Sequence, residues 1–143
     1  MARWNEVEAQ APELAARARE FFDAHKHKTL ATLRRDGSPR ISGIESEFED
    51  GELRFGSMSN AVKALDLRRD PRFALHSGSD EPTEWKGDAK VAGLAHEVES
   101  EGESHQFRAE VHELVVVYMG DPRDHIVIES WHEGRGVTQR KRY

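Results

Sequence analysis

The sequence contains no cysteine, and this absence excludes disulfide bonds and metal sites built on thiolates. It has no run that approaches the roughly 20 apolar residues of a transmembrane helix, and its first ten residues lack the apolar centre of a signal peptide. The net charge of -6 argues against binding nucleic acid through bulk positive charge. These absences predict a cytoplasmic protein that binds neither membrane nor nucleic acid.

Two kinds of catalytic site are also absent from the pattern. No Gly-x-Ser-x-Gly turn occurs, and no serine stands in a recognisable triad context, which argues against nucleophilic catalysis. The eight histidines include no His-x-x-x-His pair, and their scattered positions are typical of surface residues. We therefore expect no metal site and no catalytic side chain of these classes.

The chain of 143 residues is long enough for one domain with a real core. It shows no internal repeat, low-complexity segment or linker, so residues 1–143 are expected to form a single domain. The expected parts are an N-terminal helical region over 1–28, a barrel over 29–136 and a polar tail over 137–143.

Two tight turns carry the strongest local signals, at Asp36-Gly37 and Asp50-Gly51. An Asp-Gly pair supplies the positive backbone angles that a hairpin turn requires. The strands expected around these turns are Thr29–Leu33, Arg40–Phe48 and Glu52–Gly56, which would form an antiparallel meander. Within the second strand, alternation assigns one face to Ser42, Ile44, Ser46 and Phe48 and the other face to Ile41, Gly43, Glu45 and Glu47.

The pattern then changes to a helical period. Ser59 or Asn60 is a suitable N-cap, and Val62 and Leu65 fit one apolar stripe. Asp70-Pro71 ends this helix.

The remaining segments predict further strands with helices packed outside them. Gly93, inside one long strand, indicates a bulge or a close backbone approach. The expected helices are Pro12–Ala24 and Ser104–Glu113, and the expected strands are Phe73–His76, Trp85–Val98, Leu114–Met119 and His125–His132. Six or seven short strands with turn signals favour a closed or partly closed antiparallel barrel.

One segment has the chemistry of an anion site. Gly56–Lys63 leads from a strand end into a helix start, where free backbone N–H groups, hydroxyls and Lys63 would converge. Such an arrangement suits a phosphate. The spacing matches no Walker pattern, and an ordinary capped helix with an exposed lysine is the alternative interpretation.

The order of three segments, ATLRRDGSPRISGI, EDGELRFGS and VKALDLRRDPRFAL, resembles the pyridoxamine 5'-phosphate oxidase-like family of flavin-binding split β-barrels. The later segments AKVAGLAHEV and IESWHEGRG agree more loosely, so that the likeness covers about residues 29–136. The resemblance implies a mainly β fold, namely a six- or seven-stranded antiparallel split β-barrel with flanking helices. It also implies a homodimer with FMN in a cleft between the subunits.

The resemblance further implies which residues hold the cofactor. The strand after the first turn would contact FMN, Lys63 would bind its phosphate, and a late tryptophan would lie near the isoalloxazine. The implied cofactor-binding residues are Arg40, Ile41, Ser42, Gly43, Ile44, Gly56, Ser57, Lys63, Trp131 and Arg135. Core packing is the competing interpretation of Trp131. No side-chain acid or base is expected, because the flavin performs the redox step.

Departures from the family pattern leave other functions open. Val62 stands where many members carry an arginine before the lysine, and the C-terminal basic signature for the vitamin phosphate is absent. We therefore expect an FMN-dependent oxidoreductase that transfers hydride to a small substrate other than the vitamin. The alternatives are an F420-dependent reductase, for which Arg68, Arg69 and Arg72 would supply basic charge, and a non-enzymatic barrel that binds flavin or haem.

Overall fold

The computed structural model describes residues 2–100 and 102–143. Short strands with tight turns make up most of this part of the chain, and helices occupy its start and one crossover. In chain order the elements are α1 (Trp4–Gln10), α2 (Pro12–Asp23), β1 (His27–Leu33), β2 (Pro39–Glu49), β3 (Glu52–Ser57), α3 (Val62–Arg69), β4 (Arg72–His76), β5 (Gly87–Val98), β6 (His105–Met119), β7 (Ile126–His132) and β8 (Gly136–Arg142).

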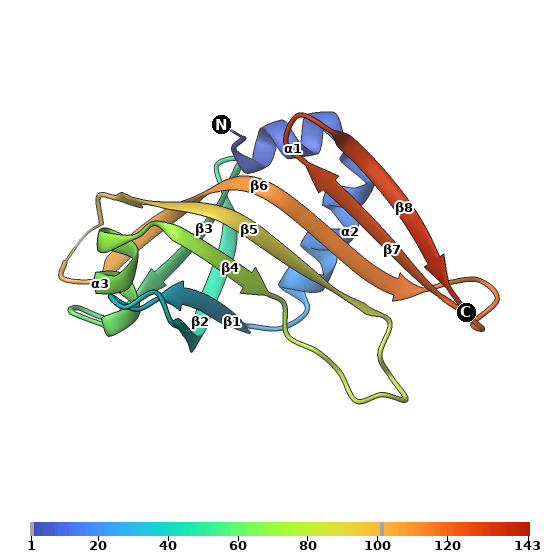
Figure 1. Cartoon of the computed structure of the whole chain (residues 1–143), viewed down its shortest axis with the longest axis horizontal. Coiled ribbons are helices and arrows are strands. Elements are labelled where there is room, and N and C mark those ends of the chain that lie inside the picture. The colour runs from blue at the N-terminus through green and yellow to red at the C-terminus, as the bar shows by residue number, and fades with distance from the viewer. Residues whose placement is uncertain (1, 101) are drawn as a thin grey trace.

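Six of the strands form a closed antiparallel barrel (Figure 1). The sheet order is β3-β2-β1-β4-β5-β6, and pairing of β3 with β6 closes the ring. The long strand β6 continues past the barrel, where β7 and β8 pair along its outer part. The predicted mainly β split barrel with flanking helices is therefore confirmed.

The turn chemistry explains the meander of β1, β2 and β3. Gly37 has a φ of +87°, and Asp50 and Gly51 have φ values of +52° and +74°, in the left-handed region that tight hairpins use. Along β2 the residues alternate between exposed and covered from Pro39 to Glu49. The two faces predicted for this strand are thus confirmed, and the outward face is the one that bears Ile41, Gly43, Glu45 and Glu47.

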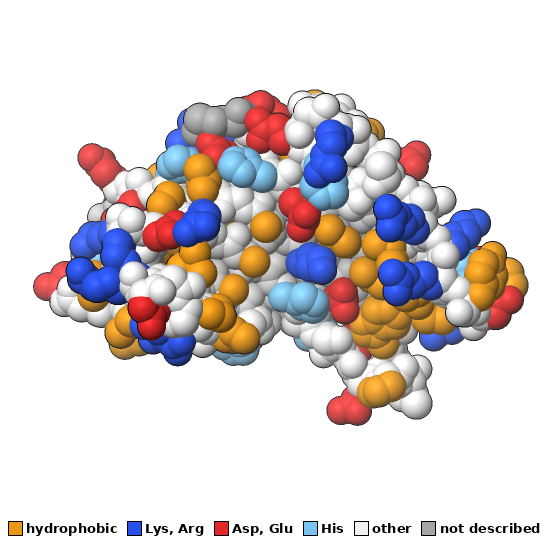
Figure 2. All heavy atoms as spheres, viewed as in Figure 1, with side chains coloured by type: hydrophobic (Ala, Val, Ile, Leu, Met, Phe, Trp, Pro, Cys, Tyr) orange, Lys and Arg blue, Asp and Glu red, His pale blue; other side chains and the backbone are white. Residues whose placement is uncertain are grey.

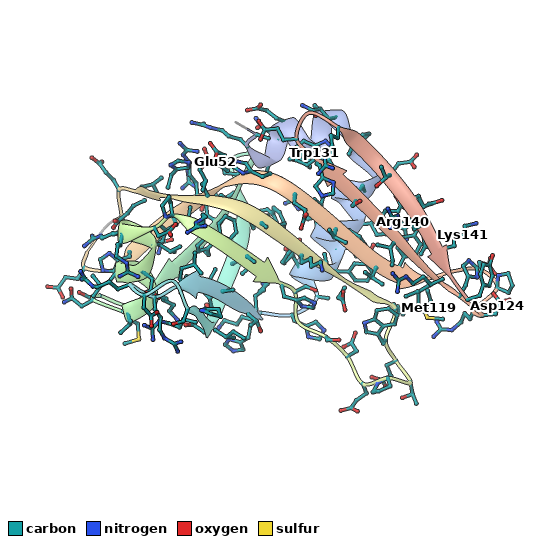
Figure 3. The ribbon with its side chains drawn as sticks, in the orientation of Figure 1. Glu52, Met119, Asp124, Trp131, Arg140 and Lys141 are labelled. Atoms are coloured by element: carbon teal, nitrogen blue, oxygen red, sulfur yellow. The ribbon has the colours of Figure 1, made fainter. Side chains whose placement is uncertain are left out.

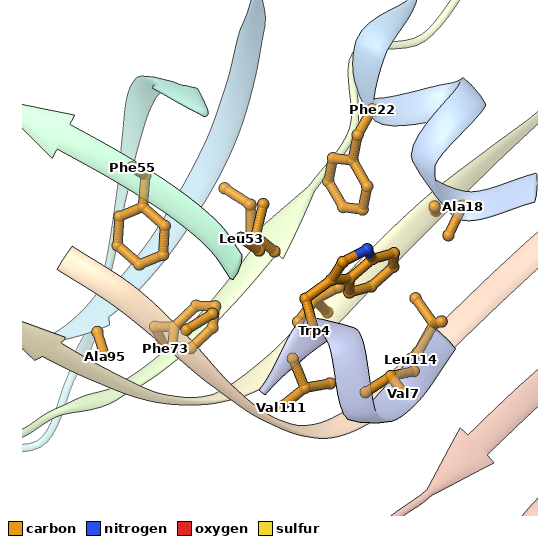
Figure 4. Packing of buried hydrophobic residues seen from close by; sticks show 14 of the residues in the cluster. Trp4, Val7, Ala18, Phe22, Leu53, Phe55, Phe73, Ala95, Val111 and Leu114 are labelled. Carbon is orange, nitrogen blue, oxygen red and sulfur yellow. The ribbon is translucent and has the colours of Figure 1, made fainter. Parts of the chain in front are cut away.

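The core fills the barrel and the space beneath the two N-terminal helices (Figure 4). Trp4 is fully buried and its ring lies 4.8 Å from that of Phe48, so α1, which the sequence left without a firm assignment, is anchored to β2. The predicted helix Pro12–Ala24 is α2, and its buried face includes Leu14, Ala18 and Phe22. Burial of Leu14 and of Phe22 contributes about 1.5–3 kcal/mol each, because these large apolar side chains leave water. The helices therefore hold one side of the barrel together.

Two sequence expectations are wrong, and both errors concern long-range pairing. Residues 104–113 were expected to be helical, but His105 begins β6, which pairs with β5 along most of its length and with β3 at its start. Residues 137–143 were expected to be a polar tail, but Gly136–Arg142 form β8, which pairs residue by residue with β7. In both segments, hydrogen bonds to distant strands outweigh a local sequence without clear alternation.

Gly93 confirms the bulge that its position predicted. The register between β5 and β6 shifts between Ala92 and Gly93, so that His112 is the extra residue on β6. A Cβ at Gly93 would lie 1.8 Å from the backbone oxygen of Glu110. Only glycine permits this approach, and the bulge bends the long β5–β6 ribbon.

The start of α3 also differs from expectation. Its N-cap is Ala61, with no side-chain cap, while Asn60 has a φ of +58° and makes the turn before the helix. Val62 and Leu65 are 52% and 43% exposed instead of lying on the packed face. Leu67, which the same stripe included less cleanly, does pack inward, together with Ala64. Among the described residues, no helix is long and apolar enough to cross a membrane.

Candidate functional site

A cavity of about 720 Å³ lies over the outer faces of β2 and β3. The segment before β1 borders it on one side, and the start of α3 borders it on the other. Its lining residues are Lys26, His27, Gly43, Ile44, Glu45, Ser46, Glu47, Arg54, Phe55, Gly56, Ser57, Met58, Lys63, Ser104 and Gln106.

We call Gly56, Ser57 and Lys63 the phosphate end of this cavity. Lys63 Nζ donates a hydrogen bond of 2.7 Å to the backbone oxygen of Gly43, which ties α3 to β2. The Ser57 Oγ is buried and has no hydrogen-bond partner among the described residues. A buried hydroxyl without a partner costs free energy, so this group is ready to bond a ligand. A lysine ammonium beside a free hydroxyl suits an anionic oxygen.

The wall of the cavity along β2 carries charges of both signs, and Glu45 lies directly across the β2–β3 pair from Gly56 of the phosphate end. Lys26 Nζ lies 3.6 Å from Glu45 Oε1, and Glu47 pairs across the strands with Arg54. Ser46 comes between the two carboxylates in the sequence but lies on the covered face of β2, where its Oγ is buried and without a partner among the described residues. This wall therefore offers charged groups of both signs to a mixed-charge portion of a ligand, and Glu45 brings a negative charge close to the phosphate end.

The structure brings together half of the residues that the sequence implied. Gly43, Ile44, Gly56, Ser57 and Lys63 all line the cavity. Ile41 lies on the same outward face of β2 but outside the cavity, and Ser42 points to the opposite face. The remaining three implied residues, Arg40, Trp131 and Arg135, have other surroundings.

Arg40 bonds a carboxylate at the end of the barrel. Its Nε donates to Asp66 Oδ2 at 2.7 Å, and the same carboxylate accepts bonds from Thr32 Oγ1 at 2.8 Å and Arg69 Nη2 at 3.2 Å. Burial on its own raises the pKa of Asp66, but the bonds from Arg40, Thr32 and Arg69 outweigh it and hold the pKa below its usual value. We call these four residues the Asp66 cluster, and it fixes α3 on β1 and β2.

Trp131 belongs to β7, and its side chain is fully buried beside the N-terminal helices (Figure 3). Its indole N–H donates to Gln10 Oε1 at 3.2 Å. This environment agrees with the core-packing interpretation. Arg135 is exposed in the hairpin between β7 and β8. A flavin contact by either residue stays a prediction.

Sequence reasoning missed several lining residues. Gln106 lies opposite Gly56, and a Cβ at Gly56 would come within 2.3 Å of the Gln106 side-chain nitrogen. The register of β3 against β2 and β6 places Gln106 and Arg54 at the cavity, so knowledge of this register would have predicted both residues. That register was hidden because residues 104–113 were expected to be helical.

The arginines after Lys63 are occupied by carboxylates. Arg68 Nε lies 2.7 Å from Glu97, and Arg72 Nη2 lies 2.7 Å from Asp70, while Arg69 belongs to the Asp66 cluster. Figure 2 shows basic side chains interspersed with acidic ones on this face of the molecule. Within the described chain, no three histidine or carboxylate groups converge in a way that could hold a metal ion.

Comparison with known proteins agrees with this geometry. The sequence model of the pyridoxamine 5'-phosphate oxidase family matches residues 14–132. No curated protein matches this chain.

Three solved structures illustrate the range of its structural relatives. A pyridoxamine 5'-phosphate oxidase-related, FMN binding protein from Nostoc punctiforme is 12% identical, with a TM-score of 0.63 over 100% of this chain and 98% of that one. PhzG from Burkholderia lata, solved with tetrahydrophenazine-1-carboxylic acid, is 15% identical, with a TM-score of 0.66 over 92% and 87%. A heme binding protein from Mycobacterium smegmatis is 15% identical, with a TM-score of 0.62 over 90% and 87%.

At these identities the solved structures establish the shared fold, and the family match spans most of the chain. Together with the cavity on β2 and β3, they make the chain a member of the pyridoxamine 5'-phosphate oxidase family.

Proposed function

We propose that this protein binds FMN in the cavity on β2 and β3 and acts as an FMN-dependent oxidoreductase. The observation that carries the proposal is the phosphate end, where Lys63 and Ser57 line one cavity and the Ser57 hydroxyl has no hydrogen-bond partner among the described residues. The FMN-binding relative from Nostoc punctiforme, which aligns along the whole chain, supports the same ligand.

The chain's own residues would bind and orient the cofactor. Lys63 and Ser57 would hold the phosphate by charge-assisted and neutral hydrogen bonds. Gly43 leaves open space on the outward face of β2, since a Cβ built there meets nothing within 4 Å. The bound flavin would supply hydride transfer, so the protein's part is to position it and to exclude water.

The arginines on and after α3 favour FMN over F420. A polyglutamyl tail needs free basic groups, but Arg68, Arg69 and Arg72 each contact a carboxylate of this chain. Haem is supported only by the mycobacterial relative, and the one histidine among the described lining residues is the exposed His27. The vitamin phosphate is not the proposed substrate, because its C-terminal basic signature is missing.

A homodimer belongs to the same proposal. Four apolar side chains are exposed on β2, on the segment after β3 and on α3, around or within the cavity wall. They are Ile41 at 74%, Met58 at 82%, Val62 at 52% and Leu65 at 43% exposure. A second copy seated there would bury them and close the cavity, and Ile41→Glu is expected to shift the sedimentation coefficient toward that of a monomer.

The deciding experiment is titration of cofactor-stripped protein with FMN, riboflavin and F420, followed by tryptophan fluorescence. Tight binding of FMN with weak binding of riboflavin, its phosphate-free analogue, is the expected result. Preference for F420 would reassign the ligand, and binding of none of the three would reject the oxidoreductase. A Soret band in protein reconstituted with haem, without flavin binding, would favour the haem-binding alternative.

A further inference from the structure

His105 stands directly behind the phosphate end. It is the first residue of β6, is 7% exposed, and pairs across the barrel seam with Ser57 of β3. Its chain neighbours Ser104 and Gln106 both line the cavity, whereas His105 itself does not. The proposed binding of FMN leaves this buried imidazole without a role.

The hydrogen bond from Asn60 indicates which ring nitrogen of His105 is the acceptor. The backbone N–H of Asn60 donates to His105 Nε2 at 3.1 Å. A backbone amide can only donate, so Nε2 must be the unprotonated acceptor nitrogen, and the proton lies on Nδ1. The Nδ1–H then donates to Glu97 Oε2, 3.1 Å away. Arg68 Nη2 lies 3.2 Å from the same nitrogen, and with the proton on Nδ1 this is a close approach and not a hydrogen bond to the ring. The Asn60 amide fixes this assignment, because it is a donor to Nε2, and the assignment describes a neutral imidazole.

Glu97 is held in place by Arg68 of α3. Arg68 Nε and Nη2 donate to its two oxygens at 2.7 and 2.9 Å, and the bonds from Arg68 and His105 lower the pKa of Glu97 to about 2. The carboxylate therefore stays charged and keeps the imidazole oriented. A continuous series of contacts leads from α3 through β5 and β6 to the backbone of Asn60.

Asn60 belongs to the short segment 58–61, which connects the phosphate end of β3 to the start of α3. Its side chain is exposed, and its φ of +58° is unusual for a residue other than glycine. The bond to His105 is thus a direct restraint on a turn that separates Ser57 from Lys63. Shifting this turn would move the two groups apart.

We propose that neutral His105 is the positioning residue of the phosphate end, acting through the amide of Asn60. The proposal rests on FMN binding at this cavity. Protonation of Nε2 would place its N–H against the N–H of Asn60, and the hydrogen bond between them would be lost. Segment 58–61 would then no longer be restrained by His105, and phosphate binding would weaken. The charged groups that face the imidazole are Glu97 from β5 and Arg68 from α3, and β3 presents the uncharged Ser57.

The test compares FMN affinity between pH 8 and 5.5 in the wild type and in His105→Gln. The amide oxygen of glutamine can accept the Asn60 bond but does not gain a proton in this range. We expect the wild type to lose about five-fold more affinity than His105→Gln on acidification, the equivalent of one hydrogen bond. The phosphate's own ionisation near pH 6 affects both proteins alike. His105→Ala should bind weakly at every pH.

Three results would count against this role. Equal losses in the wild type and in His105→Gln, or tighter wild-type binding at low pH, would reject the role of His105 while leaving FMN binding intact. Absence of FMN binding in both proteins at every pH would reject the proposed function and the positioning role together. As a second readout, the Asn60 amide resonance should shift with pH in the wild type and stay constant in His105→Gln.

Discussion

The two ends of α3 use polar side chains in opposite ways. At its start, the phosphate end contains a buried hydroxyl without a partner and a lysine that reaches across to β2. In its second half, the Asp66 cluster surrounds one buried carboxylate with three donors. A charged residue in a family-like motif does not by that fact face the ligand cavity: Arg40 and Lys63 were both expected to bind the cofactor, but of the two only Lys63 lines the cavity.

The largest expected effect tests whether Trp131 belongs to the packed core and not to the flavin site. Trp131→Ala should lower the free energy of unfolding by about 3–5 kcal/mol, because it removes a fully buried indole from the core side of β7. Urea denaturation measures this loss. The milder Trp131→Phe should leave the fluorescence of bound flavin unchanged, whereas a changed flavin spectrum would show that the indole touches the ring.

Substitutions in the Asp66 cluster should lower the stability of the fold and should not act through FMN binding. Asp66→Ala leaves Thr32, Arg40 and Arg69 without their shared acceptor, so we expect a loss of about 3 kcal/mol in unfolding free energy. The matched control is Asp70→Ala, whose exposed pair with Arg72 should matter far less. Equal losses in the two variants would contradict the structural role given to Asp66.

The phosphate end should show the reverse behaviour. Lys63→Ala should weaken FMN binding by about 1.5–3 kcal/mol, the range for a hydrogen bond to a charged group, while riboflavin affinity stays the same. Isothermal titration calorimetry with both ligands measures the difference. If FMN affinity did not change in the folded variant, the assignment of the phosphate would be wrong.

Ser57→Ala sharpens the same comparison with a smaller effect. Removal of a neutral hydroxyl should cost FMN about 1 kcal/mol of affinity. In the protein without ligand, the variant should be no less stable than the wild type, since the hydroxyl has no partner among the described residues. A large loss of unliganded stability would mean that Ser57 serves the fold.

The pH dependence of stability tests the Asp66 cluster. The folded-state pKa of Asp66 lies below its unfolded value near 3.9, so its contribution is present above about pH 4 and is lost as the pH falls through the folded pKa. Asp66→Asn should flatten the acid limb of the stability curve measured by urea titration between pH 5 and 2. An unchanged slope would show that other carboxylates govern acid unfolding.

Local chemistry in the sequence determined much of the frame. The two Asp-Gly turns, the alternation of β2, the helix from Pro12 and the bulge at Gly93 depend on residues a few positions apart, so they could be predicted. The cavity residues Gly43, Gly56, Ser57 and Lys63 follow from the same segments, because these segments carry the family pattern.

Tertiary structure alone decided the rest. Residues 105–113 are a strand because β3 and β5 pair with them, and residues 136–142 are a strand because β7 does. The same closure places Gln106 beside Gly56 and His105 behind Ser57, and the docking of α3 turns Arg40 to Asp66. These contacts join residues tens of positions apart, so only barrel closure brings them together, and no short-range pattern in the sequence encodes them.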